Sequence, residues 1–179
     1  MKWFQNGLAV LFATVAILLA TPAMALEGSS TRPGGLGIGV GQTFVSGISL
    51  KQNAGGNGLQ GVIGCFGYRG WSNSCRGIGI SGDFLVHMPV FLDADVVALG
   101  WNLGGGASVG VGFDGHYYGG DYYGSGTFHL GGQFVAGFEV LFPTVPLDLV
   151  IEWRPMLRVA PGFRIHPFSG GAHIRFYLN

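Results

Sequence analysis

Polar and apolar residues alternate with a period of two along much of the chain. Within residues 128–142, His129, Gln133 and Glu139 fall on one parity, and four Phe, one Leu and one Val fall on the other. A period of two is that of a β-strand whose two faces meet different surroundings. The same alternation recurs over residues 76–87, 147–156 and 170–179. The sequence therefore predicts an all-β fold.

The polar face of these segments carries few charges. The 179 residues are 48% hydrophobic and 10% charged, with nine Lys and Arg against nine Asp and Glu. A chain this apolar and without net charge does not stay solvated as a coil, and clustered basic residues for nucleic-acid binding are missing from the sequence. A soluble β-sandwich would carry many Lys and Glu on its outer faces. A sparsely charged polar face opposite an oily one is typical of an outer-membrane barrel with a polar lumen and a lipid-facing exterior.

The first 25 residues have the pattern of a secretory signal peptide. Lys2 provides a positive start, residues 8–20 are uncharged and apolar, and residues 23–25 form an A-x-A cleavage pattern. The apolar run is shorter than the ~20 residues that a membrane-spanning helix needs. We therefore predict a signal peptide at 1–25, a short periplasmic segment at 26–34 and an outer-membrane barrel at 35–179.

We predict eight strands, although a count of six stays open. Single-chain bacterial barrels have an even number of strands, with short turns at one end and longer loops at the other. Because an unpaired backbone group in hydrocarbon costs several kcal/mol, the sheet must close. The predicted fold is a closed antiparallel up-and-down transmembrane barrel with long outer loops at 69–75, 107–126 and 158–169. The predicted strands are 35–42, 46–52, 58–68, 76–87, 94–106, 127–142, 147–157 and 170–179.

The interior of an eight-stranded barrel is wide enough only for side chains, so we predict a packed lumen and no open pore. Three basic and three acidic residues have inward parity, and they predict a charge-paired network. These residues are Lys51, Arg154 and Arg175 together with Asp83, Glu139 and Glu152.

A catalytic interpretation of the lumen is weaker. Ser81, Asp83 and His87 have the residue types of a hydrolase triad, but strand rise places Asp83 and His87 roughly 13 Å apart. A site assembled with Glu139 or His129 from another strand stays open as the alternative. The five His residues show no zinc-ligand spacing. We predict no catalytic, cofactor or metal site and no cofactor.

Cys65 and Cys75 bracket the predicted loop at 69–75. In an oxidising envelope compartment such a pair is typical of a disulfide. Their strand parities differ, however, and a bridge would need a bulge or an irregular strand end to bring the Cα atoms within ~7 Å. The sequence therefore leaves both possibilities open: a disulfide between Cys65 and Cys75, or two free thiols.

Residues 115–126 form a loop rich in Tyr, Gly and Ser. Tyr offers a large rigid contact area with a hydrogen-bonding tip, as in the binding loops of antibodies. The loop is therefore a candidate surface-binding site for an extracellular ligand, with a flexible tip and an interfacial aromatic belt as the alternative. Its candidate residues are Tyr117, Tyr118, Tyr122 and Tyr123.

Four short motifs resemble the strands of small, largely uncharacterised bacterial outer-membrane barrels related in shape to the OmpA transmembrane domain. They lie at residues 35–41 (GLGIGVG), 83–87 (DFLVH), 146–155 (PLDLVIEWRP) and 170–178 (GGAHIRFYL). The resemblance implies an integral outer-membrane protein without an assigned reaction, with outer-membrane lipid, lipopolysaccharide and the barrel-assembly machinery as partners. Chains of this kind usually end in an aromatic residue, whereas this one ends Tyr177-Leu178-Asn179.

Three classes of function remain: a non-enzymatic membrane barrel, of which adhesin-like binding is one form, an outer-membrane enzyme, and a soluble ligand-carrying barrel. We expect a non-enzymatic outer-membrane barrel with a structural or surface-interaction role and no nucleic-acid partner. An outer-membrane enzyme acting on lipid A acyl chains is an alternative, as is adhesin-like binding through residues 115–126. A soluble ligand-carrying barrel of lipocalin type is the third, and it is disfavoured because a single core would have to account for two different faces.

Overall fold

The computed structural model describes residues 32–66, 75, 77–113, 116–118, 121–123 and 126–178. The predicted signal peptide at 1–25 and residues 26–31 of the predicted periplasmic segment lie outside the described residues.

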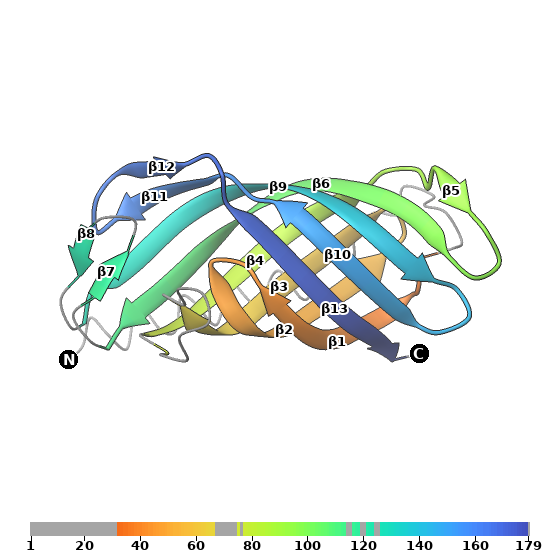
Figure 1. Cartoon of the computed structure of the whole chain (residues 1–179), viewed down its shortest axis with the longest axis horizontal. Coiled ribbons are helices and arrows are strands. Elements are labelled where there is room, and N and C mark those ends of the chain that lie inside the picture. Colours follow the sequence, from red (N-terminus) through yellow and green to blue (C-terminus); the bar gives the residue numbers. More distant parts are fainter. Residues whose placement is uncertain are drawn as a thin grey trace.

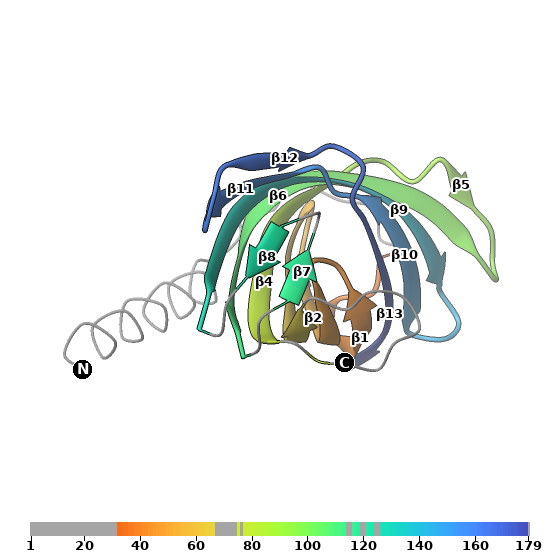
Figure 2. The same cartoon turned by 60° about the vertical axis from the view of Figure 1, so that its left-hand side comes forward.

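Eight long antiparallel strands close into a barrel (Figures 1 and 2). They follow the chain around the wall as neighbours, and the first and last strands pair from Leu36 with Leu178 to Gln42 with Ala172. The predicted closed all-β fold with eight strands is confirmed. The strands are β1 (Gly35–Gln42), β2 (Val45–Ala54), β3 (Asn57–Phe66), β4 (Gly77–His87), β6 (Ala98–Gly112), β9 (Phe128–Phe142), β10 (Leu147–Trp153) continued by β11 (Met156–Ala160), and β13 (Gly170–Leu178).

Two ends of the barrel differ in their connections. The loop end carries the β1–β2 turn at residues 43–44 and the connections that contain the β7–β8 hairpin and β12 (Arg164–His166). The terminal end carries the start of β1, the end of β13 and the turns at 55–56 and 143–146. In the turn at 55–56, Gly55 has a φ of 60°, which is in the left-handed region that favours glycine.

The predicted boundaries of the fifth strand were wrong. We predicted strand at 94–106 and an outer loop at 107–126, whereas β6 begins at Ala98 and continues to Gly112. Residues 107–112 alternate Ser108 inward with Val109 and Val111 outward, and they pair with both β4 and β9. Pairing on both sides overrides the weak strand preference of a glycine-rich segment. Before β6, the short strand β5 (Leu92–Asp93) folds back onto its first residues.

The seventh wall strand also extends further than predicted. β10 and β11 flank Arg154 and Pro155, and Pro155 cannot donate a ladder hydrogen bond because it has no N–H. β11 then pairs with β9 and with β12, so residues 158–160 and 164–166 of the predicted loop at 158–169 are strand.

Charge is confined to the inside of the wall. Seven charged residues lie within the barrel strands, and all of them are buried, whereas no outward-facing position of these strands carries a charge. The outward positions instead hold large apolar residues, including Phe134 (44% exposed), Ile151 (70%) and Ile174 (44%). The buried charged residues are Lys51, Asp83, Glu139, Asp148, Glu152, Arg158 and Arg175.

The lumen changes character along its length. At the loop end Phe44 and Phe66 stack with ring centroids 5.5 Å apart, and His129 meets Phe66 edge-on at 4.7 Å. Val45 and Val62 complete this apolar cluster in the loop half of the interior. The remaining interior toward the terminal end is mostly polar.

Glycines in the wall make room for the charged residues. A Cβ on Gly106 would lie 2.0 Å from the carbonyl oxygen of Gly82 and 2.3 Å from Oδ1 of Asp83. Gly82 itself faces outward, and a Cβ there would meet nothing within 4 Å. The two glycines are therefore a matched pair of test positions.

We expect Gly106→Ala to lower the free energy of unfolding by about 1–3 kcal/mol, because the new methyl group overlaps fixed backbone and displaces Asp83. Gly82→Ala is the control, with a change of at most about 1 kcal/mol in the stabilising direction. Urea unfolding followed by tryptophan fluorescence measures both. Equal stability of the two variants would contradict the close packing at Gly106.

Candidate functional site

Glu139 lies at the centre of the terminal half of the lumen, with none of its surface exposed. Lys51 Nζ contacts its Oε1, and Asn102 Nδ2 donates to the same oxygen at 2.8 Å. Its Oε2 accepts from Arg32 Nε at 3.0 Å and lies 3.8 Å from His87 Nδ1. Because Arg32 precedes β1, the segment before the first strand turns into the barrel and joins the lumen.

Asp148 on β10 and Arg175 on β13 form a bidentate ion pair next to this site. Arg175 donates from Nε and Nη2 to the two carboxylate oxygens, each at 3.0 Å. The Tyr177 hydroxyl adds a hydrogen bond of 2.8 Å to Oδ2, and Lys51 Nζ lies 3.8 Å from that oxygen. Parallel bonds of this kind fix the guanidinium geometry as well as neutralising its charge. Lys51 thereby links this pair to Glu139.

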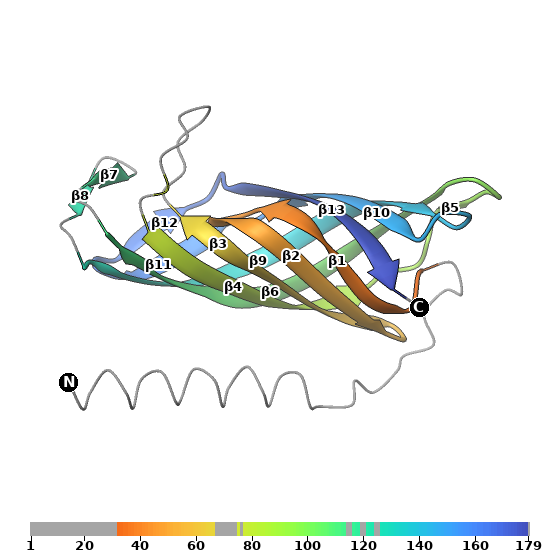
Figure 3. The ribbon, with the colours of Figure 1, turned by 90° about the horizontal axis from the view of Figure 1, so that it is seen from below.

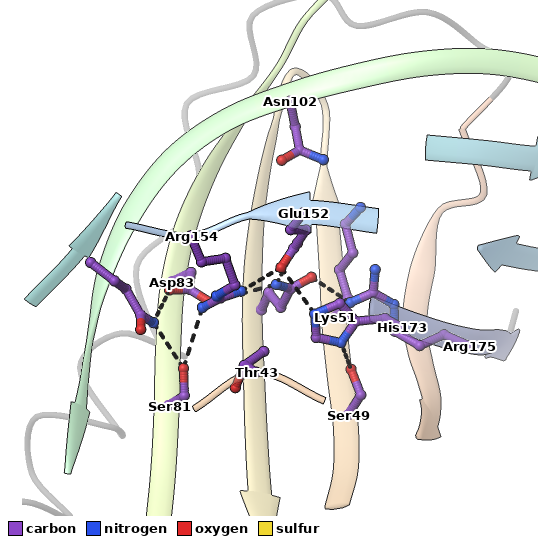
Figure 4. A network of polar contacts seen from close by, with 12 residues as sticks. Thr43, Ser49, Lys51, Ser81, Asp83, Asn102, Glu152, Arg154, His173 and Arg175 are labelled. Carbon is purple, nitrogen blue, oxygen red and sulfur yellow. Dashed lines mark hydrogen bonds and ion pairs between the residues drawn. The ribbon is translucent and has the colours of Figure 1, made fainter. Parts of the chain in front are cut away.

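Arg154 lies between two carboxylates in the loop half of the lumen (Figure 4). Its Nη2 donates to Asp83 at 2.6 Å, and its Nη1 contacts Glu152. Gln133 Nε2 donates to the other oxygen of Asp83 at 2.5 Å. Glu152 also meets His173 Nε2 at 3.1 Å.

Gln60 connects the two halves. Its Nε2 donates to Glu152 Oε1 at 2.9 Å, and its Oε1 accepts from Arg175 Nη1 at 2.5 Å. The result is one continuous network that runs from Arg32 and Glu139 at the terminal end to Asp83 and Gln133 in the loop half. In it four cationic side chains, Arg32, Lys51, Arg154 and Arg175, meet four carboxylates, Asp83, Glu139, Asp148 and Glu152.

The structure brings together all six residues of the predicted charge network. Sequence reasoning left out Asp148, Tyr177, Gln60 and Arg32. Asp148 shares the strand parity of Glu152, and Tyr177 shares that of Arg175, so parity could have found both. Arg32 lies outside every strand, and no periodic signal marks it.

Ser81, Asp83 and His87 do not form a triad. Ser81 and Asp83 both accept from Gln133, while His87 Nε2 meets Asn53 Oδ1 at 3.0 Å in the other half of the lumen. A different Ser–His–carboxylate chain is present. His173 joins Ser49 Oγ at 3.0 Å to Glu152 at 3.1 Å. Ser49 has no exposed surface.

Cys65 and Cys75 are joined by a disulfide, with Cα atoms 5.3 Å apart. Cys75 precedes the first residue of β4, Gly77, and is therefore not bound by the strand parity that opposed a bridge. Residues 69–74 of the predicted loop lie outside the described residues.

The predicted surface-binding loop contains a short hairpin. β7 (His116–Tyr118) pairs with β8 (Asp121–Tyr123), which places Tyr117 opposite Tyr122. The side chains of this segment lie outside the described part of the chain. Ligand binding by these tyrosines stays a prediction.

Within the ranges that the structure describes, no group of three or more His, Cys, Asp or Glu residues is arranged to hold a metal ion. The described ranges contain no helix with the length and apolar character needed to span a membrane.

We expect Arg175→Met to lower the free energy of unfolding by about 3–5 kcal/mol, because it leaves the buried carboxylate of Asp148 without its main partner. Adding Asp148→Leu removes that uncompensated charge and should restore much of the loss. Urea unfolding of the two variants beside the parent protein measures the difference. A double variant as unstable as the single one would show that packing, rather than charge pairing, makes Arg175 necessary.

Comparisons of the chain with protein-family models, curated proteins and solved structures find no match. The case for a function therefore depends on the geometry of the barrel itself.

Proposed function

We propose that this chain is an integral outer-membrane β-barrel protein with a closed, charge-paired lumen and a structural or surface-interaction role. One observation carries the proposal. Every charge in the barrel strands faces inward and is buried, while the outward face of each wall strand presents large apolar side chains.

This arrangement is the inverse of a water-soluble barrel. A soluble fold hides apolar residues and leaves charges outside, and exposed apolar patches larger than a few hundred Å² are rare on monomers. Here the apolar surface runs around the whole wall. Each of the eight wall strands contributes to it, with Leu36, Ile48, Ile63, Ile78, Trp101, Phe128, Ile151 and Ile174 as one example from each. Hydrocarbon is the surrounding that makes such a face favourable.

Two further features support the outer membrane as the location. A closed barrel satisfies every wall backbone group internally, which is the condition for spanning a bilayer with strands. The predicted signal peptide and the Cys65–Cys75 disulfide both fit an oxidising compartment beyond the inner membrane. The proposal places the loop end outside the cell, with outer-membrane lipid and lipopolysaccharide around the wall and the barrel-assembly machinery as the insertion partner.

We propose no enzymatic role. Among the described residues, Ser49, His173 and Glu152 come nearest to a hydrolase triad, and all three side chains are buried in the lumen. A lipid acyl chain on the outside of the wall does not reach the Ser49 hydroxyl. The β7–β8 hairpin at the loop end is the segment that we propose for contact with an extracellular ligand.

The membrane placement can be tested with Ile151→Arg. Ile151 is 70% exposed in the middle of the β9–β10–β13 wall, and an arginine at the bilayer midplane costs about 2–4 kcal/mol. We expect that loss in the free energy of unfolding from lipid vesicles. Val96→Arg is the control, because Val96 is 65% exposed in the β4–β6 connection at the terminal end. It should change stability by less than about 0.5 kcal/mol.

Two outcomes would contradict the proposal. One is an equal, negligible effect of Ile151→Arg and Val96→Arg, as expected for a surface in water. The other is recovery of the folded parent protein in the aqueous periplasmic fraction without detergent, instead of in urea-washed outer membranes.

The closed lumen makes a separate prediction. The aromatic cluster at the loop end and the ion pairs below it fill the interior, so we expect no steady ion conductance from the folded protein in planar bilayers. A general porin recorded in the same set-up controls for insertion and sensitivity. Large, stable openings of the purified barrel would overturn the closed-lumen part of the proposal and leave the membrane placement standing.

A further inference from the structure

Strand β1 repeats a two-residue unit of one glycine and one apolar residue. Its positions of inward parity are all glycine, and its outward positions before Gln42 are all large and apolar. The inward-parity residues are Gly35, Gly37, Gly39 and Gly41, and the outward ones are Leu36, Ile38 and Val40. A shift of β1 by two residues therefore keeps glycine inside and apolar side chains outside. Register is weakly specified in glycine-rich strands, so β1 by itself does not determine how it pairs.

Strand β1 pairs with β13 at the seam where the two ends of the sheet meet (Figure 3). In the observed register Gln42 pairs with Ala172, so the first two residues of β13 lie beyond the last pair. A shift of β1 by two residues toward the loop end would pair Gln42 with Gly170 and would lose no backbone pair. We call this alternative the shifted register. A shift in the opposite direction would instead bring the turn at 43–44 into the seam.

The inward side of the seam accommodates the shifted register as well. In the observed register the Tyr177 ring lies over Gly37, where a Cβ would be 2.8 Å from its Cε1. In the shifted register Tyr177 would face Gly35, and Arg175 would face Gly37 instead of Gly39. These side chains would again meet residues without a Cβ. Neither the backbone nor the side chains of the seam therefore select the observed register.

Contacts that reach across the seam from β2 and β3 do differ between the two registers. Gln60 on β3 accepts from Arg175 on β13 at 2.5 Å and donates to Glu152 on β10 at 2.9 Å. Lys51 Nζ on β2 lies 3.8 Å from Asp148 Oδ2 on β10. Because β2 and β3 move with β1, the shift displaces them relative to β13 by about 6–7 Å along the strand direction. The observed hydrogen bonds do not survive a displacement of that size.

The shifted register would also bring two cations together. Residues that pair across neighbouring strands form a row, and in the structure Lys51 shares its row with Gly37 and Tyr177. In the shifted register the residue opposite Gly37 would be Arg175. Lys51 and Arg175 would then stand in one row with only a glycine between them, and two buried cations in a narrow interior repel each other.

We propose that Gln60 and Lys51 act as a register lock, which selects one of two registers in which β1 and β13 close the barrel. Setting a register is the best-attested use of buried polar groups that add little net stability. The proposal gives part of the charge network a role beyond filling the lumen. It goes beyond the proposed function, and it concerns the closed barrel whether or not a membrane surrounds it.

Cysteine cross-linking reports the register directly. Ile38→Cys with Phe176→Cys places two cysteines opposite each other in the observed register, and Leu36→Cys with Phe176→Cys does so only in the shifted one. All three positions face outward. Directly opposite Cα atoms are ~4.5–5.5 Å apart, within reach of a disulfide, whereas diagonal neighbours are too far apart. Cys65→Ser and Cys75→Ser are added so that only the introduced cysteines can pair.

Each protein is refolded in detergent micelles and oxidised, and its disulfides are identified by mass spectrometry. In the parent we expect only the 38–176 cross-link. Gln60→Leu removes the contacts with Arg175 and Glu152 without removing a charge, and it should raise the 36–176 cross-link at least about tenfold. Gln133→Leu is the matched control. Gln133 is also buried, but it bonds Ser81 and Asp83 from β9 to β4 and does not reach across the seam, so the cross-links should stay as in the parent.

Lys51→Met is a second variant should Gln60→Leu fold poorly, because it removes the repulsion from Arg175 that opposes the shift. Only folded protein is counted, as separated by its migration in unheated gels. A folded variant of either kind that cross-links only at 38–176 would overturn the lock, since the seam would then select its own register. A 36–176 cross-link in the parent, or an equal rise with Gln133→Leu, would overturn it as well.

Discussion

Backbone closure is the constraint on which the rest of this structure depends. The pairing of β1 with β13 joins the two ends of the sheet, so no wall strand is left with an open edge. Closure creates a narrow inside that side chains fill and an outside that one surrounding medium must cover. Each strand therefore points alternate side chains into the lumen and out of the wall. The period-two pattern of polar and apolar residues in the sequence follows from this alternation.

A narrow interior places strict demands on the charges inside it. An ion without a partner in such a space costs several kcal/mol, so each carboxylate of the network has at least one cationic neighbour. Gln60 links the two halves of the network through its hydrogen bonds to Glu152 and Arg175. Arg32, which precedes the first strand, adds a cationic partner for Glu139. The glycines of the wall, of which Gly106 is one of the tightest cases, leave the space that these long side chains occupy. Charge pairing and small wall residues are therefore two parts of one packing solution.

The outward face and the lumen both support the proposal of a closed membrane barrel. An apolar exterior around the whole wall fits hydrocarbon, and a filled, neutralised interior fits a barrel that does not conduct ions. The burial of Ser49 inside the lumen keeps the Ser–His–carboxylate chain apart from any lipid on the outer surface.

The sequence by itself determined the all-β class, the inward or outward direction of the side chains and most strand positions, because parity is a local property of the chain. It also placed six network residues in the lumen, but it did not say which would pair, since the contacts Lys51–Glu139 and Arg154–Asp83 join strands far apart in sequence. The extension of β6 to Gly112 was missed because strand pairing on both sides, and not local preference, holds those glycines. Only the tertiary structure decided that Arg32 enters the lumen and that Cys75 forms a disulfide with Cys65. Arg32 and Cys75 both lie outside the strands, so the period-two pattern does not predict where their side chains point.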